Sequence, residues 1–137
     1  MSDKTISLKV ITPERVFFEG EVKQFIVRTK GEVGDFAVLA DHAPLTSAIG
    51  LGKLEIELPN GDRKISTLFE GYAVINTNQA VIICNAAEWP EEIDAERAEN
   101  SKSRAENRLQ KTSQEDIDFK RAEASLYRAI TRLSLKK

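Results

Sequence analysis

Six arginines recur in two matching groups near the C-terminal end of the sequence. Two copies of one pattern carry them: Arg97, Ala98, Glu99, Ser101, Arg104, Ala105, Arg108 and Leu109, then Arg121, Ala122, Glu123, Ser125, Arg128, Ala129, Arg132 and Leu133. Because spacings of seven and eleven residues return to the same side of an α-helix, each copy places three arginines in one stripe. A guanidinium group stays charged and binds phosphate or carboxylate through a planar fork of N–H donors. The repeat therefore predicts a binding site for a polyanion.

Ion pairing within the helices is the alternative use of these arginines. Helices with arginine and glutamate three or four residues apart are common, and each exposed ion pair contributes only about 0–1 kcal/mol. Two observations favour a ligand: the stripes have the same phase in both copies, and acidic residues do not match every arginine. We therefore expect a bound anion, or an acidic surface of a partner, on these helices.

The arginine pattern lies in a part of the chain that contains no glycine or proline. All seven glycines and all four prolines fall at or before Pro90, and both residue types interrupt helices. This change predicts a β domain over residues 1–88 and an α-helical domain over residues 89–137. The predicted fold class is α+β, with an antiparallel β-sandwich or flattened barrel followed by an antiparallel two-helix hairpin.

Short segments rich in β-branched residues alternate with turn signals before this boundary. They predict strands over residues 6–11, 25–29, 54–58, 64–69, 72–76 and 80–84. A tight turn joins two of these strands at residues 59–62, where Asn60 and Gly61 readily adopt positive φ. Because no helical segment separates the strands, an antiparallel arrangement is favoured over a parallel sheet.

Two helices are predicted after the boundary. The first covers residues 93–109, and the second starts at Thr112 or Ser113, with Asp116 completing a capping box. A short turn between them would place Asp94 opposite Arg128. The same count places Arg97 near Ser125 and Arg104 level with Asp118.

The expected anion site lies where the first helix begins. Arg97, Arg128 and Arg132 are predicted to meet there, and the free amides and dipole of a helix N-terminus also favour anions. The small or sparse apolar residues of the two helices give the hairpin limited stability, at about 25 cal/mol per Å² of buried apolar area. A ligand that bridges both helices would therefore hold the hairpin closed.

Composition excludes several other functions. The net charge of −2 and the pI near 5.6 give no reason to expect nucleic-acid binding or attraction to an anionic membrane. No segment approaches the roughly 20 apolar residues that span a bilayer, and no targeting segment is evident, so direct membrane insertion is not expected. His42 is the only histidine, which excludes zinc sites built from several histidines or cysteines. The only cysteine, Cys84, lies in an apolar run and is predicted to be a buried structural thiol.

Several short segments resemble landmarks of the epsilon subunits of rotary, F-type ATP synthases, in the correct order. They are residues 8–13, 20–22, 31–36 and 42–45, followed by Ile93-Asp94-Ala95-Glu96-Arg97-Ala98, which matches the nucleotide-binding signature of the bacterial members. The resemblance covers the full chain and implies a β-sandwich followed by an α-hairpin. Ala40 departs from the family, which often has proline before its histidine.

The resemblance implies a regulatory ATP site, and a magnesium ion can accompany the triphosphate. Ile93, Asp94 and Ala98 would contact the adenosine, with Glu88 beside it. The phosphates would be bound by Arg97, Arg104, Arg128 and Arg132, with Arg108 and Arg121 as further contributors. Neither a catalytic residue nor a dedicated metal site is implied.

The implied function is that of a non-catalytic rotor subunit in the central stalk of the proton-translocating ATP synthase, coupling rotation to ATP synthesis. Its partners would be the gamma subunit, the ring of c subunits and, when the hairpin extends, the alpha/beta catalytic head. It would lie at the cytoplasmic face of the bacterial cell membrane as a peripheral component. ATP would hold the hairpin compact, and its loss would allow an extension that blocks hydrolysis. The alternative is a structural adaptor whose arginines bind an acidic partner protein and no nucleotide.

Overall fold

The computed structural model describes residues 4–29, 35–111 and 117–136. The chain divides into two compact units, Met1–Glu88 and Trp89–Lys137, which are described separately. Part of the segment 31–36, the predicted second-helix starts at Thr112 and Ser113, and the capping residue Asp116 all lie outside the described residues.

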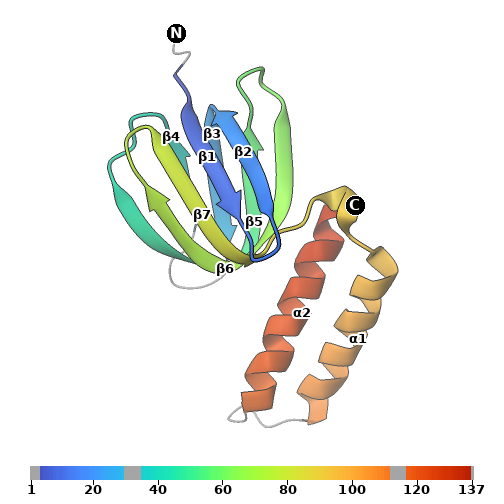
Figure 1. Ribbon diagram of the computed structural model, residues 1–137. Coiled ribbons are helices and arrows are strands. Elements are labelled where there is room, and N and C mark those ends of the chain that lie inside the picture. Colours follow the sequence, from blue (N-terminus) through green and yellow to red (C-terminus); the bar gives the residue numbers. More distant parts are fainter. Residues whose placement is uncertain (1–3, 30–34, 112–116, 137) are drawn as a thin grey trace. The chain divides into compact units, whose positions relative to one another are not determined.

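The first unit is one seven-stranded sheet that curls back on itself (Figure 1). Its strands are β1 (Ile6–Ile11), β2 (Val16–Val22), β3 (Gln24–Thr29), β4 (Phe36–Leu39), β5 (Leu45–Glu57), β6 (Arg63–Ile75) and β7 (Gln79–Ala86). They follow the order β2-β1-β7-β6-β5-β3-β4 across the sheet. Neighbouring strands are antiparallel except β1 and β7, which pair in parallel. The predicted α+β class, with a β-sandwich followed by a helical hairpin, is confirmed.

Large apolar side chains fill the inside of the curled sheet. Alternate residues of β1, namely Ile6, Leu8 and Val10, have no exposed surface. Phe25 of β3 and Leu54 of β5 are equally buried. Because side chains in a strand point alternately to opposite faces, this pattern places one face of each strand in the core.

The two long strands, β5 and β6, pair with each other on both sides of the point where the sheet bends. Phe69 and Gly71 of β6 pair with Leu51 and Ile49 of β5 on either side of Glu70. Glu70 has a φ of 50°, which is uncommon for a residue other than glycine. A Cβ added to Gly71 would lie 1.9 Å from the carbonyl oxygen of Ile83, so only glycine fits this close approach of β6 and β7. The sequence pattern predicted two separate strands here, whereas β6 continues without a break from Arg63 to Ile75.

The predicted tight turn joins β5 to β6 as expected, and the strand register pairs Ile56 with Lys64. Gly61 has a φ of 92°, but Asn60 does not have positive φ, contrary to the prediction. Asn60 instead accepts a hydrogen bond through its side-chain oxygen from the amide of Asp62, at 2.9 Å. This local bond is a common alternative use of asparagine in turns. The strands β2 and β4, at the two edges of the sheet, were not predicted.

The second unit contains a 3₁₀ turn, η1 (Pro90–Glu92), and two helices, α1 (Ala95–Lys111) and α2 (Ile117–Leu135). The helices lie side by side and run in opposite directions (Figure 1). The first helix starts two residues later and ends two residues later than predicted. Within the described residues, neither helix is long and apolar enough to cross a membrane.

Candidate anion-binding site

Alanines form the contact between α1 and α2. Ala98 and Ala105 of α1 are each 3% exposed, and Ala122 and Ala129 of α2 are 1% and 0% exposed. Each pair is seven residues apart, so each helix has one alanine stripe facing the other helix. At the end of the hairpin, Lys136 Nζ donates to the carbonyl oxygen of Pro90 at 3.1 Å. In an antiparallel pair with these ends together, Ala98 lies level with Ala129 and Ala105 with Ala122.

This register corrects the predicted one by about one helical turn. By this register, Asp94 comes level with Leu133, next to Arg132, rather than with Arg128, and Arg97 comes level with Ile130 rather than with Ser125. The prediction assumed a short turn centred near residue 112, but α1 continues to Lys111 and the described part of α2 begins only at residue 117. The longer connection shifts the facing residues without changing which side of each helix carries the arginines.

All six arginines lie on one face of the hairpin. Arg97, Arg104, Arg121 and Arg128 each precede a buried alanine by one residue, which is about 100° around a helix. Two antiparallel helices that meet through equivalent stripes are related by a two-fold axis perpendicular to both, so equivalent positions lie on the same face of the pair. Arg108 and Arg132 follow a buried alanine by three residues, about 60° away on the same side.

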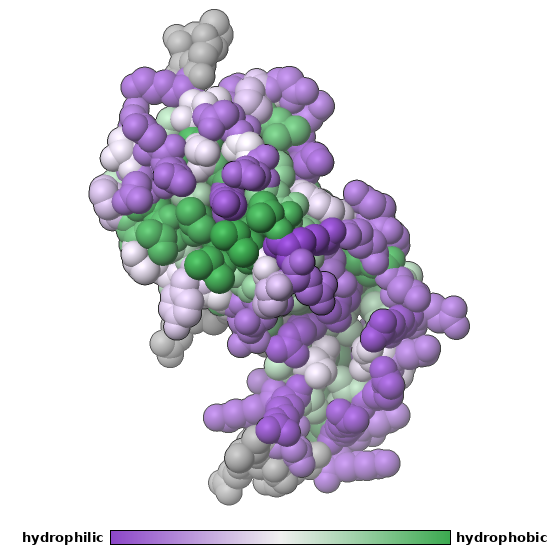
Figure 2. Space-filling model, in the orientation of Figure 1, coloured by the Kyte–Doolittle hydropathy of each residue, from purple (hydrophilic) through white to green (hydrophobic). Residues whose placement is uncertain are grey.

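The glutamates of the repeat lie on the opposite face. Glu99, Glu106 and Glu123 each follow a buried alanine by one residue and are exposed. Figure 2 shows that the surface of this unit is mostly hydrophilic. The separation of arginine from glutamate produces a cationic face, with Asp94 and Asp118 as the acidic residues of the repeat on that side.

Three of these arginines are available to a ligand. Arg97, Arg104 and Arg121 are exposed, and none of them forms an ion pair with another residue in the described part of the chain. Arg104 Nη2 donates to Ser101 Oγ at 3.3 Å, which places its guanidinium group over the arginine face. Arg28 of the β unit, by contrast, pairs with Glu55 at 3.0 Å. Three unneutralised guanidinium groups on one face attract anions.

Asp94 caps α1 and occupies an amide that the sequence analysis expected to be free. The Arg97 amide donates to Asp94 Oδ1 at 3.1 Å, in the usual N-cap arrangement. The preceding amides of Glu92 and Ile93 donate to the carbonyl oxygens of Trp89 and Pro90, at 3.0 and 3.2 Å. The amide of Arg97 therefore already has an acceptor at this end of the helix.

The other residues predicted to contact the nucleotide are Ile93, Glu88, Ala98, Arg128 and Arg132. Ile93 is 5% exposed, between η1 and α1. The backbone of Glu88 belongs to the β unit, where its amide donates to Thr67 Oγ1 at 2.8 Å and its carbonyl accepts from the Thr67 amide at 3.0 Å. Ala98 contributes its small side chain to the helix contact. Arg128 and Arg132 are half-buried on α2.

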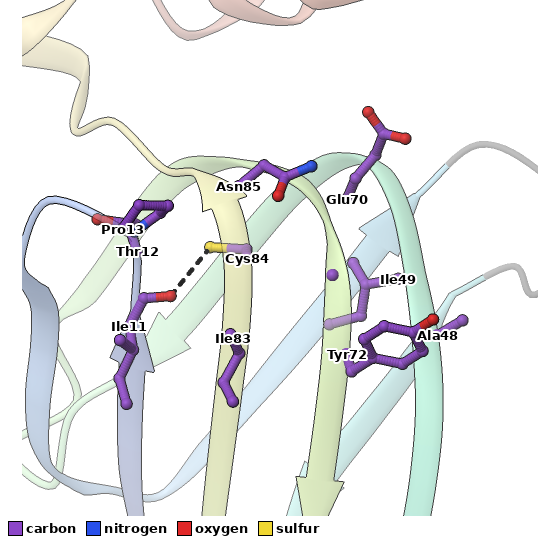
Figure 3. A pocket seen from close by; sticks show the side chains of 11 residues that line it. Ile11, Thr12, Pro13, Ala48, Ile49, Glu70, Tyr72, Ile83, Cys84 and Asn85 are labelled. Atoms are coloured by element: carbon purple, nitrogen blue, oxygen red, sulfur yellow. Dashed lines mark hydrogen bonds between the residues drawn. The ribbon is translucent and has the colours of Figure 1, made fainter.

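A cavity of about 610 Å³ lies in the β unit (Figure 3). Its lining is Ile11, Thr12, Pro13, Ala48, Ile49, Glu70, Gly71, Tyr72, Ile83, Cys84 and Asn85. The lining includes one carboxylate and no lysine or arginine, so its chemistry does not suit a polyanion. Cys84 donates from Sγ to the Ile11 carbonyl oxygen at 3.8 Å, and burial raises the pKa of this thiol to about 11. The prediction of a buried structural cysteine is confirmed.

The arginine repeat is longer than the sequence-based prediction recognised. The signature Ile93-Asp94-Ala95-Glu96-Arg97-Ala98 recurs as Ile117-Asp118-Phe119-Lys120-Arg121-Ala122 at the start of α2. Extending the repeat four residues toward the N-terminus from Arg97 and Arg121 would have found it. The hairpin therefore contains two copies of the complete signature.

Comparison with protein families matches both units. Residues 5–90 match the model described as ATP synthase, Delta/Epsilon chain, beta-sandwich domain, and residues 91–137 match ATP synthase, Delta/Epsilon chain, long alpha-helix domain. The chain is 42% identical over 132 residues to the ATP synthase epsilon chain of Clostridium novyi, covering 96% of this chain and 98% of that one. It is 41% identical over 106 residues to the sodium ion specific epsilon chain of Acetobacterium woodii, covering 77% and 78%.

A solved structure shares the fold. A chain in the mitochondrial ATP synthase of Euglena gracilis, solved as OSCP/F1/c-ring, superposes with a TM-score of 0.80 at 23% identity. The match covers 93% of this chain and 78% of that chain. Together with the family matches, the comparisons confirm the resemblance predicted from the sequence.

Proposed function

Because the chain belongs to the ATP synthase delta/epsilon chain family, we propose that it is a central-stalk subunit whose helical hairpin binds ATP and thereby regulates the enzyme. Members of this family are non-catalytic subunits of the ATP synthase complex. The observation that carries the proposal is the gathering of six arginines on one face of the hairpin, opposite the glutamates of the same repeat.

The triphosphate binds at the end of this face where α1 begins. Arg97 of α1 is level with Ile130, midway between Arg128 and Arg132 of α2, and Arg132 lies next to the level of Asp94. Guanidinium groups from both helices can therefore surround one phosphate chain, and Arg104 lies further along α1. Charge-assisted hydrogen bonds of this kind are the strong ones in proteins.

The adenosine lies beyond the phosphates, near the η1 turn. Ile93 provides an apolar contact, Ala98 contributes its small side chain, and Glu88 precedes η1 by two residues along the chain. Asp94 has a structural task as the cap of α1, and one of its oxygens remains for the ligand. A magnesium ion that accompanies the triphosphate would be held chiefly by the phosphates, which is common for this cation.

ATP regulates the protein by holding α1 against α2. The buried apolar residues described within the two helices are alanines, and each of them removes only a small apolar area from water. A ligand that binds the closed hairpin alone adds a stabilisation of about 2.7 kcal/mol at a concentration 100 times its Kd. When ATP is scarce the helices separate, extend toward the catalytic head and restrain hydrolysis.

The β unit attaches the protein to the rotor. Tyr72, Val74 and Ile83 on β6 and β7 are exposed by 62%, 41% and 53%. Figure 2 shows hydrophobic side chains gathered on one face of this unit. Contiguous exposed apolar surface of this kind marks protein interfaces. The gamma subunit and the c-subunit ring are the partners we propose, at the cytoplasmic face of the bacterial membrane.

Isothermal titration of the full chain with ATP, with and without magnesium, tests the nucleotide site. We expect the Arg97→Gln/Arg132→Gln variant to bind ATP at least tenfold more weakly than the unaltered chain. The Lys102→Gln/Lys120→Gln variant removes the same charge from positions outside the arginine face and should bind normally. Absence of ATP binding by the unaltered chain would reject the regulatory site and favour the adaptor function.

A further inference from the structure

We propose that the hairpin carries a second site for a polyphosphate chain, formed by Arg104 and Arg108 of α1 with Arg121 of α2. The proposal goes beyond the function above and does not require ATP at the first site. It starts from the second copy of the signature, in which Asp118, Arg121 and Ala122 repeat the spacing of Asp94, Arg97 and Ala98.

The contact between the helices converts this sequence repeat into a spatial symmetry. Ala98 is level with Ala129, and Ala105 is level with Ala122. Ala98 and Ala122 are equivalent positions of the two copies, and so are Ala105 and Ala129. Each level pair therefore joins one of these positions in the first copy to the other position in the second copy. A two-fold axis through the middle of the hairpin therefore exchanges the two copies, with Ser101 and Ser125 at its level.

The axis divides the six arginines into two equivalent groups. The first group is Arg97, Arg128 and Arg132, beside Asp94. Applying the axis to each member gives the second group, which is Arg121, Arg104 and Arg108, beside Asp118. Arg97 and Arg104 are seven residues apart on α1, so the two groups are separated by about 10 Å along the hairpin.

The groups of the second site can bind a polyanion. Arg104 and Arg121 are exposed and have no ion pair among the described residues. Among the described residues of the two signature copies, three guanidinium groups and the carboxylate of Asp118 give this group a net positive charge. Planar guanidinium forks on two facing helices suit successive phosphate groups of one chain.

A linear chain of phosphates is the chemistry that both sites share. Glu88 and the η1 turn, to which the adenosine contact is assigned, precede the first copy of the signature. No equivalent sequence precedes the second copy. The second site therefore selects the phosphates without the nucleoside. Its ligand is either inorganic polyphosphate or the phosphate end of a nucleotide.

Titration with inorganic tripolyphosphate tests the second site in the full chain. The unaltered protein should bind two molecules, and Arg97→Gln/Arg132→Gln should still bind one. Adding Arg108→Gln/Arg121→Gln to that variant should abolish the remaining binding, whereas adding Lys102→Gln/Lys120→Gln should retain it. Circular dichroism establishes that each variant keeps its helices. Replacing tripolyphosphate with ATP shows whether the second site also accepts a nucleotide.

The Arg97→Gln/Arg132→Gln variant keeps this test separate from the proposed ATP site. If that variant binds no tripolyphosphate while its helices remain intact, the second site does not exist. The same conclusion follows if its remaining binding persists after Arg108→Gln/Arg121→Gln. Absence of ATP binding by the unaltered chain, with tripolyphosphate still bound by the variant, would reject the proposed function and leave the second site standing.

Discussion

The contacts that stabilise the β unit and those that stabilise the hairpin involve side chains of very different size. The β unit buries large side chains completely, among them Phe25, Phe69 and Leu54, whereas the buried residues shared by α1 and α2 include four alanines. Burying a large apolar side chain contributes about 1.5–3 kcal/mol, and an alanine methyl contributes far less. The comparison indicates that larger buried side chains stabilise the β unit, and it supports our proposal that a ligand holds the hairpin closed.

The largest expected effect comes from emptying the core of the β unit. Phe25→Ala should lower the free energy of unfolding of that unit by about 3–5 kcal/mol, because it removes contacts and leaves a cavity. Urea unfolding followed by amide exchange measures the loss separately in each unit. Phe18→Ala, at a half-buried position of β2, is the matched control and should cost less. An equal loss in the two variants would contradict the assigned core.

Overpacking the helix contact should act on the other unit. Ala105→Leu should lower the stability of the hairpin by about 1–3 kcal/mol, since a larger side chain forces α1 and α2 apart. It should also weaken ATP binding while leaving the exchange rates of the β unit unchanged. Ala95→Leu makes the same replacement at an exposed position of α1 and should have little effect on stability. Similar amide protection in α1 for both variants would show that alanines do not set the helix spacing.

A smaller effect separates the two tasks of Asp94. Asp94→Ala should destabilise α1 by about 1 kcal/mol through loss of the N-cap, whereas Asp94→Asn retains the cap and removes the charge. Thermal melting of the helices measures the cap, and calorimetry measures ATP affinity. We expect Asp94→Asn to melt like the unaltered chain. If both variants melt alike, the cap does not stabilise α1.

The smallest effect concerns the cysteine of the β unit. Because burial raises the pKa of Cys84 to about 11, its thiol stays neutral and unreactive at pH 8. The folded state favours the neutral thiol, so this contribution to stability is complete below the ordinary thiol pKa of 9.0 and is lost as the pH rises toward 11. Alkylation should be slow in the folded protein at pH 8 and fast in urea. Fast alkylation of the folded protein would contradict the burial.

Local patterns in the sequence predicted what depends on one element alone. The β-branched residues of segment 6–11 identified β1, and the seven-residue spacing of the arginines placed them on one side of each helix. These predictions hold because side-chain direction follows directly from helix or strand periodicity. The composition change at Pro90 likewise predicted the change from strands to helices.

Features that depend on contacts between elements could not be read in the same way. The left-handed conformation of Glu70 comes from the bend that β5 and β6 share, so nothing in the residue itself indicated a continuous strand. The edge strand β2 carries Glu19, Gly20 and Glu21, which weaken a β pattern. The facing register of the hairpin depended on the length of its turn, which shifted the level of Asp94 by about one helical turn.

Amide hydrogen exchange in α1 and α2, with and without saturating ATP, tests the central claim most directly. If ATP holds the cationic face of both helices, the amides of Ala105 and Ala122 should exchange about 100-fold more slowly at an ATP concentration 100 times its Kd. The amides of the β unit should not change. Exchange rates in both helices that are indifferent to ATP, in a chain shown to be folded, would contradict the account.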